Sequence, residues 1–455
     1  MANFNSVKDF GAVGDGIADD TAACQACINT GLDVFFPEGK YKVSTLTLKN
    51  QFQGAFGIAP NKSVIVGTAS GTAVLNTTQF FQGTIKDLGI TRPSPVAFQS
   101  GSHGLHVQDQ GYVSTLQNLR VSNCDDGIYV GLTAGAWVVN CFAEQNAGAG
   151  FHLDAPNLLV TGCYANSNKY GYWATNNNAG GYFYDCTGYN NTTNNLRIEG
   201  SASLTMNDVF MRGFVSSYSN SHGVYIDSNG RNITFQDGFV EYAGTNPSTG
   251  TIVDQGAIGV FVTANNTNVN ISNSIIYANA YNGMLINCNE FKVTGCQMAT
   301  NNLANNGGVG LYVNGTHDFI IEGNDLGGKG SNGTNSYGLG IGSANLTRAV
   351  VSNNLVGGRV GGIYRGGGPI NGVDTIFSNN AGDSIQAITP ALPGNSVRIT
   401  NTQGFDVNVY ISGGNAAVYI NEEATGLSTG TFTLRAGSTM VMFYSVAPTW
   451  HWMRS

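Results

Sequence analysis

Charged residues are scarce in this 455-residue chain: only 11% are Asp, Glu, Lys or Arg, and the formal net charge is −8. A nucleic acid or an anionic membrane surface requires a basic face on its partner, so this balance disfavours both. No segment approaches the roughly eighteen uninterrupted apolar residues of a membrane-spanning helix. An acidic polysaccharide is not excluded, because a few local Arg and Lys residues can still line a groove.

Cysteine is also sparse, with eight residues. Four of them hold one equivalent place in four repeats: Cys141, Cys163, Cys186 and Cys296. This pattern predicts a stack of small buried hydrophobic side chains with free thiols, rather than disulfides or a metal site. Free thiols suit assembly in a reducing compartment. The first residues show no basic start followed by an apolar run, so no signal peptide is visible.

Glycine, in contrast, is abundant, with 63 residues, and much of it belongs to one repeated phrase. The phrase, a small residue followed by apolar, variable and apolar residues, recurs between residues 104 and 365 at spacings of 21 to 36 residues. A period in the twenties is typical of a solenoid, in which each repeat buries its apolar face against its neighbours. Alternation with a period of two indicates strands and not helices. Each repeat is therefore predicted to be one coil of a β-helix.

A second phrase lies between the copies of the first and adds at least one more strand to each coil, as in residues 159–163 and 291–296. Asparagine recurs after this second strand. The recurring residues are Asn146, Asn168, Asn191, Asn279 and Asn302. Asparagine tolerates left-handed turns, and stacked side-chain amides can hydrogen-bond from coil to coil.

Residues 1 to about 50 differ from the repeats. Asp19, Asp20 and Thr21 are N-cap candidates for a helix from about Thr21 to Asn29, and this helix is predicted to cover the first coil. The run DFGAVGDGIADDTAA, together with VFFPEGKYKVS, closely resembles the N-terminal cap of pectate-lyase-like right-handed β-helix proteins. That group includes bacteriophage tailspike depolymerases and polygalacturonases. The resemblance implies an all-β, right-handed parallel β-helix.

After residue 393 the pattern changes to alternating strands at hairpin spacing, which predicts a small antiparallel β domain. The chain is thus divided into an N-terminal cap (1–50), a β-helix (51–390) and a C-terminal β module (391–455). In phage tailspikes, which the chain resembles in layout, such a module drives trimer assembly, and the apolar end Trp450–Met453 fits that role. The alternative is a simple cap on the last coil.

Alternation along the repeated phrase directs its two apolar side chains inward and the residue between them outward. The outward residues of successive coils stack about 4.8 Å apart and form a column along the axis. Six of them are predicted to bind substrate: His106, Tyr129, His152, Trp173, Arg197 and Tyr225. Sugar rings pack against aromatic rings arranged in line. A subunit interface is enriched in the same residue types and is the alternative.

Two residues further along each strand, a second outward column contains the carboxylates Asp154, Glu199 and Asp227. Hydrolysis of a glycosidic bond needs one protonated and one ionised carboxyl group. Glu199 and Asp227, about 4.8 Å apart, suit a retaining mechanism, whereas Asp154 and Glu199, about 10 Å apart, suit an inverting one. Glu199 belongs to both pairs and is predicted to be the general acid. An acidic surface with ordinary ion pairs, such as Arg197 with Glu199, is the alternative.

Other motifs compete with this assignment. Residues 125–126 resemble the paired aspartates of polygalacturonases, and residues 221–223 resemble the histidine motif of that family. The order differs, however, because the basic phrase at 197–199 precedes the histidine phrase. Glu144 and Glu241 follow the second strand and could line the edge of the same cleft.

Together these features favour a phage or prophage tailspike-like depolymerase that hydrolyses a bacterial capsular or lipopolysaccharide-type glycan. The resemblance implies a homotrimer in the virion tail, with other tail proteins as further candidate partners and with no metal or other cofactor. Two alternatives remain. One is a polysaccharide lyase in which His152, Arg197 or Tyr225 abstracts a proton beside a uronate carboxylate. The other is a fibre that binds glycan without cleaving it.

Overall fold

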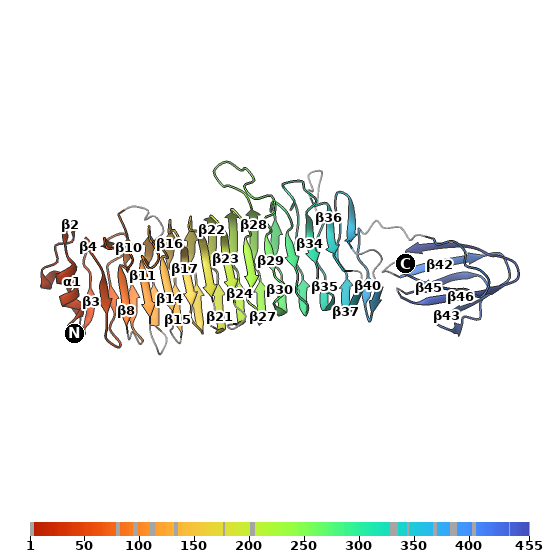
Figure 1. The fold of residues 1–455 in the computed structure, drawn as a ribbon, viewed down its shortest axis with the longest axis horizontal. Coiled ribbons are helices and arrows are strands. Elements are labelled where there is room, and N and C mark those ends of the chain that lie inside the picture. Colours follow the sequence, from red (N-terminus) through yellow and green to blue (C-terminus); the bar gives the residue numbers. More distant parts are fainter. Residues whose placement is uncertain are drawn as a thin grey trace.

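The computed structural model describes residues 4–454 except 79–81, 94–98, 109–113, 132–134, 176–177, 201–204, 328–334, 344, 367–370, 383–388, 403–405 and 436. The chain winds into a long parallel β-helix, with a helix at its N-terminal end and an antiparallel module beyond its last coil (Figure 1). Every described pairing from β1 to β40 is parallel, as the repeated phrase predicts, apart from one isolated antiparallel bridge between Thr245 and Ile252. No helix within the described ranges is long and apolar enough to cross a membrane.

Three parallel sheets form the β-helix, and each coil contributes a strand to two or all three of them. Sheet B ends at β31, after which isolated parallel bridges continue along its edge. Sheet A contains β1 (Phe4–Ser6), β3 (Asp33–Phe35), β6 (Ala55–Phe56), β9 (Thr84–Lys86), β12 (Ser114–Gln117), β15 (Ala136–Val139), β18 (Leu158–Thr161), β21 (Asn178–Tyr184), β24 (Met206–Arg212), β27 (Arg231–Gln236), β30 (Thr267–Ser272), β33 (Phe291–Thr294), β35 (His317–Glu322), β37 (Asn345–Ser352), β39 (Asn371–Val373) and β40 (Ile376–Ser378). Sheet B contains β2 (Asp15–Asp19), β4 (Gly39–Val43), β7 (Ser63–Gly67), β10 (Gly89–Thr91), β13 (Arg120–Ser122), β16 (Phe142–Glu144), β19 (Tyr164–Asn166), β22 (Thr187–Asn191), β25 (Val215–Ser219), β28 (Phe239–Ala243) and β31 (Ile275–Tyr277).

Sheet C is built from the repeated phrase. It contains β5 (Leu46–Leu48), β8 (Leu75–Thr78), β11 (Leu105–Gln108), β14 (Ile128–Gly131), β17 (Ala149–Asp154), β20 (Tyr170–Thr175), β23 (Asn194–Glu199), β26 (Val224–Asp227), β29 (Val260–Val262), β32 (Met284–Ile286), β34 (Val309–Val313), β36 (Tyr337–Ile341) and β38 (Gly361–Arg365). The apolar residues of the three sheets form one continuous core from Val7 to Phe377. The inward half of the predicted alternation is therefore confirmed.

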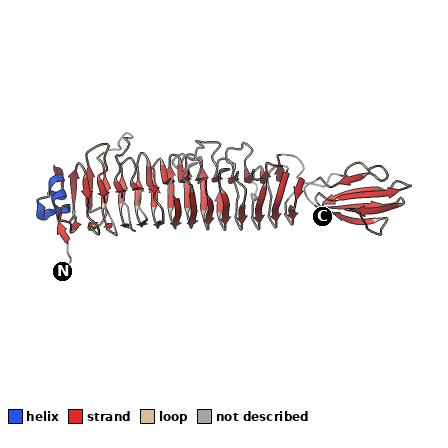
Figure 2. Cartoon of the chain, turned by 60° about the horizontal axis from the view of Figure 1, so that its bottom comes forward, coloured by secondary structure: helices blue, strands red, loops and turns tan. Residues whose placement is uncertain are grey.

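The N-terminal cap consists of a short 3-10 helix (Val7–Phe10) and α1 (Thr21–Ile28), which lies over the open end of the first coil (Figure 2). Asp20 stands at the N-cap position, but its carboxylate accepts hydrogen bonds from the N–H groups of Val13 and Gly14 instead of from the helix. The sequence does contain one Cys-x-x-Cys pair, Cys24 and Cys27 on α1, although free thiols were expected from the lack of this spacing. Both are buried free thiols, and burial raises their pKa values to about 12 and about 11.

The C-terminal module contains two antiparallel sheets. Its strands are β41 (Arg398–Thr400), β42 (Val407–Ser412), β43 (Ala416–Ile420), β44 (Glu423–Ala424), β45 (Gly430–Leu434), β46 (Thr439–Tyr444) and β47 (Thr449–Arg454). The apolar end, predicted to support trimerisation, forms β47, which pairs with β42. Trp452 is buried in the module's own core, and the indole N–H of Trp450 donates to the carbonyl of Pro390. The division at residues 50 and 390 remains a prediction.

All eight cysteines are buried free thiols, as predicted. Asparagine ladders run beside them through the core. Asn146 donates its amide to Asn168 and Asn168 donates to Asn191, at 2.9 and 3.1 Å. A second ladder joins Asn279 to Asn301, and not to Asn302 as the spacing suggested. A third ladder runs through Asn324, Asn354 and Asn380. Each amide also satisfies a backbone group in a neighbouring coil, so the ladders hold the coils in register.

Replacing the central amide of the first ladder is expected to destabilise the β-helix. Asn168→Ala removes the acceptor of the Asn146 backbone and side-chain N–H groups and leaves them buried without a partner. The expected loss is about 1–3 kcal/mol, which is the usual cost of an unsatisfied buried polar group. Thermal unfolding followed by circular dichroism measures it. The matched control is Asn166→Ala on the outer face of β19, and an equal loss of stability in both variants would contradict the ladder's role.

Candidate active site on sheet C

The outward residues of sheet C stand in the register that the sequence predicts. Strand pairing aligns His106 with Tyr129, Tyr129 with His152, and His152 with Trp173. It continues from Trp173 to Arg197 and then to Tyr225. The second column is aligned in the same way, with Gly131 beside Asp154 and Glu199 beside Asp227. All nine predicted site residues therefore share one face, in two parallel columns.

The rings of the first column stack on one another rather than lying open to a ligand. Ring centroids are 4.7 Å apart between His106 and Tyr129, 4.5 Å between Tyr129 and His152, and 4.4 Å between His152 and Trp173. Side chains on adjacent coils are so close that each ring covers its neighbour's face. These contacts leave less ring face for a sugar from His106 to Trp173, and sugar stacking on this column remains a prediction. The column also presents ring edges and polar atoms to a ligand.

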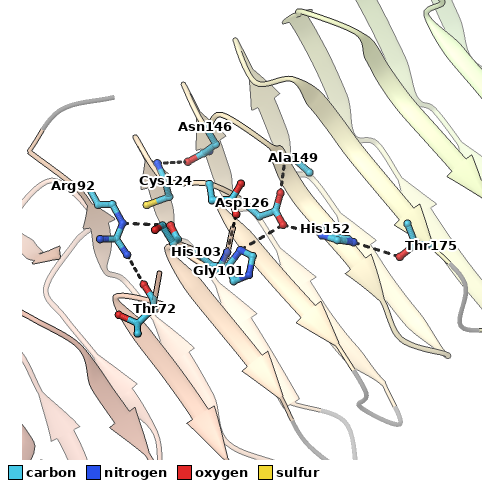
Figure 3. Close-up of polar contacts among 12 residues, drawn as sticks. Thr72, Arg92, Gly101, His103, Cys124, Asp126, Asn146, Ala149, His152 and Thr175 are labelled. Carbon is cyan, nitrogen blue, oxygen red and sulfur yellow. Dashed lines mark hydrogen bonds and ion pairs between the residues drawn. The ribbon is translucent and has the colours of Figure 1, made fainter. Parts of the chain in front are cut away.

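The carboxylate of Asp126 contacts two histidines, His152 and His103 (Figure 3). Asp126 Oδ2 accepts from Nδ1 of His152 at 2.8 Å, and Nδ1 of His103 lies 3.4 Å from the same oxygen. Asp126 Oδ1 accepts from the N–H of Ala149. Burial works against ionisation of Asp126, yet the hydrogen bond and charge of His152 hold its pKa below the ordinary value. Asp126 is thus an ionised, buried carboxylate that orients His152.

The orientation of His152 follows from that contact. Because Asp126 is ionised and can only accept, Nδ1 of His152 carries the proton. Nε2 is then the acceptor in the neutral ring, and the hydroxyl of Thr175 lies 3.3 Å from it. An imidazole held by a carboxylate at one nitrogen and free to take a proton at the other is a general-base arrangement.

Asp154 lies beside this pair in a different electrostatic environment. Burial raises its pKa, although His152 and the hydroxyls of Thr175 and Tyr129 partly oppose the shift. Its Oδ1 is buried and has no hydrogen-bond partner within the described part of the chain. Asp154 therefore favours the protonated state more than an ordinary aspartate does.

Glu199 has the opposite character. Its carboxylate accepts from Nε and Nη2 of Arg197 at 2.9 and 2.7 Å, and from the indole N–H of Trp173 at 2.9 Å. The Arg197 hydrogen bonds, followed by that of Trp173, hold the pKa of Glu199 below its ordinary value. A carboxylate stabilised in this way is a poor proton donor, which disfavours the general-acid role expected for it.

Asp227, the third predicted carboxylate, accepts from the hydroxyl of Thr263, and the hydroxyl of Tyr225 lies 3.5 Å from its other oxygen. The guanidinium of Arg197 lies 4.7 Å from the ring centre of Tyr225. Arg197 thus contacts both Glu199 and Tyr225. These contacts place Asp227 beside Glu199 but leave it outside the Asp126–His152 pair.

Of the competing carboxylates, Asp126 belongs to the site, whereas Glu144 and Glu241 do not. Glu144 pairs with Arg120 on sheet B, and Glu241 accepts from Ser217 on the same sheet, so both lie on another face. Asp125 lies beside Asp126 and accepts from the N–H of Gly101; burial, and then the Asp126 charge, raise its pKa to about 6. Apart from its position just before the repeated phrase, nothing in the sequence identifies His103 as a site residue.

Comparisons with known proteins agree with this architecture. Residues 4–94 match the family described as rhamnogalacturonase A/epimerase, pectate-lyase-like, and residues 82–240 match the right-handed β-helix region family. Mannuronan C5-epimerase AlgE1 of Azotobacter vinelandii is 28% identical over 207 residues, which are 42% of this chain and 14% of the relative. A probable glucan endo-1,3-β-glucosidase of Arthroderma benhamiae is 36% identical over 203 residues, which are 35% of this chain and 23% of the relative. The chain thus spans less than a quarter of either relative.

Two solved structures share the fold over most of the chain. The A-module of mannuronan C-5 epimerase AlgE6 of Azotobacter vinelandii has a TM-score of 0.50 and 18% identity, and the match covers 83% of this chain and 97% of that one. The Dettilon tailspike protein has a TM-score of 0.50 and 11% identity, and the match covers 97% of this chain and 93% of that one. At these identities the likeness concerns the fold alone. The right-handed, pectate-lyase-like β-helix implied by the N-terminal cap is confirmed.

Acid is expected to destabilise the site through its histidines. Burial lowers the pKa values of His222 and His106 to about 4, from an ordinary value of 6.5. The unfolded chain therefore binds more protons between pH 6.5 and 4, so these two residues reduce stability as the pH falls through that window. Asp125, with its raised pKa, acts in the opposite direction below about pH 6.

The contribution of His222 can be isolated by His222→Asn, because an amide oxygen can replace Nδ1 as acceptor for the N–H of Ile258. Melting temperatures are measured at pH 7, 5.5 and 4.5. The variant should lose less stability than the wild type between the first and the last pH. A steeper loss in the variant would contradict the depressed pKa.

Proposed function

We propose that sheet C between β11 and β26 binds an extended polysaccharide strand and that the protein hydrolyses its glycosidic bonds. The observation that carries the proposal is the divergence of two carboxyl groups on one face. Burial raises the pKa of Asp154, whereas Arg197 lowers that of Glu199. Titratable groups whose environments move their pKa values apart are the usual signature of an acid and base pair.

Asp154 then supplies the proton. It protonates the glycosidic oxygen as the bond to the anomeric carbon breaks, and ionised Glu199 accepts a proton from the water that attacks that carbon. The two strands are separated by β20, so the carboxyl groups stand roughly 9.6 Å apart by stacking alone, which suits inversion. The roles of acid and base are therefore the reverse of those expected from the sequence.

Asp227 provides a second arrangement for the same reaction. It is the direct neighbour of Glu199 across the β23–β26 ladder, about 4.8 Å away by stacking. That separation suits a retaining mechanism. The unpartnered Asp154 oxygen and the raised pKa of Asp154 favour the inverting pair.

A second function is favoured by the hydrogen bond between Asp126 and His152. An imidazole base positioned by a buried carboxylate can abstract the proton beside the carboxylate of a uronate, and nearby Arg197 offers a cation for that carboxylate. Elimination then gives a lyase product, and return of the proton to the opposite face gives an epimer. Both hypotheses, hydrolysis and proton abstraction, involve a polysaccharide bound to the same face of sheet C.

The biological setting is proposed on separate grounds. Eight buried free thiols suit assembly in a reducing cytoplasm, and a separate antiparallel module beyond the last coil suits subunit association. We therefore propose a homotrimeric tailspike of a phage virion, acting on a bacterial surface glycan together with other tail proteins. Because Trp452 is buried within the module, contacts between subunits must use its outer residues or the β-helix.

The hydrolytic assignment predicts distinct effects for two conservative variants. Purified protein is screened on capsular and lipopolysaccharide-type glycans, and release of reducing ends is measured. Asp154→Asn and Glu199→Gln should each lower the rate at least about 100-fold, the typical contribution of a general acid or base, and leave glycan binding intact. The matched control is Asp237→Asn, which changes an aspartate that directly follows β27 and is ion-paired with Arg212 of sheet A. Near wild-type rates in both active-site variants would exclude this pair.

The chemical nature of the product separates the two functions. A lyase leaves an unsaturated sugar that absorbs in the near ultraviolet, an epimerase incorporates deuterium from heavy water without chain cleavage, and a hydrolase does neither. Hydrolysis predicts that His152→Gln retains cleavage with weaker binding. Loss of all turnover in His152→Gln, with an unsaturated or deuterated product from the wild type, assigns the reaction to the Asp126–His152 pair. Binding without any turnover identifies a glycan-binding fibre.

A further inference from the structure

Sheet C contains a concave region far from the candidate active site. We call it the tyrosine hollow, and it is defined by Tyr281, Tyr312, Tyr337 and Tyr364 with Asn282 and Asn314. It encloses about 420 Å³ and lies over β32, β34, β36 and β38. None of the described residues that line the hollow carries a charge. Concave sites with aromatic walls and a few polar groups are typical of small-ligand binding.

Two glycines on one coil, Gly340 and Gly342, shape the hollow. Strand register places Gly340 between Tyr312 and Tyr364. A Cβ at Gly340 would lie 2.5 Å from the Tyr312 ring, and one at Gly342 would lie 2.1 Å from Oδ1 of Asn314. The ring of Tyr312 lies over Gly340, and its centroid is 6.4 Å from that of Tyr364 at an angle of 34°. In the column from His106 to Trp173, every coil carries a ring and neighbouring faces cover one another. In the hollow, one coil carries none.

The polar groups of the hollow are also available to a ligand. Among the described residues, no hydrogen bond involves the hydroxyls of Tyr281, Tyr312, Tyr337 or Tyr364. Phenol hydroxyls both donate and accept, and the asparagine side chains add amide groups. Aromatic walls, together with uncharged donors and acceptors, match a neutral pyranose, which offers apolar C–H faces and a rim of hydroxyls. The described residues of the lining offer no cation to a uronate or a phosphate.

We propose that the tyrosine hollow is a binding subsite for a neutral hexopyranose unit of a glycan. Tyr312 belongs to the same outward column as Trp173, five coils further along, which is about 24 Å by stacking. One extended strand on sheet C reaches both places. This inference rests on the proposed function, since the unit in the hollow belongs to the polymer bound at the active site. The hollow raises affinity for long chains and takes no part in bond cleavage.

Binding is measured by calorimetry on the full chain with five hexasaccharides. Four are neutral, namely laminarihexaose, cellohexaose, maltohexaose and mannohexaose, and the fifth, hexamannuronate, is anionic. At least one neutral hexaose should bind the wild type, and Tyr312→Ala combined with Tyr364→Ala should weaken it at least tenfold. Gly340→Ala, whose Cβ would displace the ring of Tyr312, should do the same without removing a ring. Tyr182→Ala is the matched control, since Tyr182 on sheet A is 41% exposed and Tyr364 is 40% exposed.

Three results would overturn the proposal: no neutral hexaose binds, the double variant binds as the wild type does, or hexamannuronate binds more tightly than every neutral hexaose. With any polymer that the protein cleaves, the double variant should raise KM about tenfold at unchanged kcat, because it removes binding that ground and transition states share equally. A fall in kcat instead would place the hollow in the catalytic machinery and contradict the subsite. If no polymer is cleaved but the hexaose still depends on Tyr312 and Tyr364, the subsite stands and the hydrolytic function fails.

Discussion

The parallel hydrogen-bonded ladder between coils determines where every other group in the β-helix lies. It fixes adjacent coils about 4.8 Å apart, which is close to the spacing of two aromatic rings in contact. Side chains at one register position must therefore touch. In the core this contact produces the asparagine ladders, in which each amide serves the next coil. On the surface it produces the stacked rings from His106 to Trp173.

The same constraint explains how one repeated phrase yields two different surfaces. Where every coil supplies a ring, the faces are covered and only edges and polar atoms remain for a ligand. Where one coil supplies glycine, as at Gly340, the ring of Tyr312 extends over the glycine towards Tyr364, two coils away. The surface of a solenoid is thus shaped as much by the omission of a side chain as by its presence.

Much of the fold was predictable from the sequence because the ladder converts the spacing of residues along the chain into positions along the β-helix axis. Gly-apolar-x-apolar specifies a strand, its parity specifies the outward residue, and the fixed rise specifies the neighbour, so the columns could be placed by counting. Counting fails where a turn changes the offset. Asn301 and not Asn302 continues its ladder, because the ladder depends on turn conformation and not on the distance from the previous asparagine. The apolar C-terminus shows another limit, since apolar composition cannot tell a subunit contact from an internal strand.

The chemical character of the site was harder to predict than its position, because it depends on contacts between different columns. Arg197 and Glu199 lie two residues apart on one strand, so their pairing could be anticipated, and that pairing argues against Glu199 as a proton donor. Asp126 lies just before its strand, outside the alternation that sorts outward residues, yet it reaches His152 one coil away. Asp154 acquires its raised pKa from burial beside Tyr129 and His152, a property of the neighbouring coils and not of its own phrase. In a chain with so few charges, each carboxylate takes its protonation state from one or two neighbours. The two reactions considered for this face therefore differ only in which of these neighbouring pairs meets the substrate.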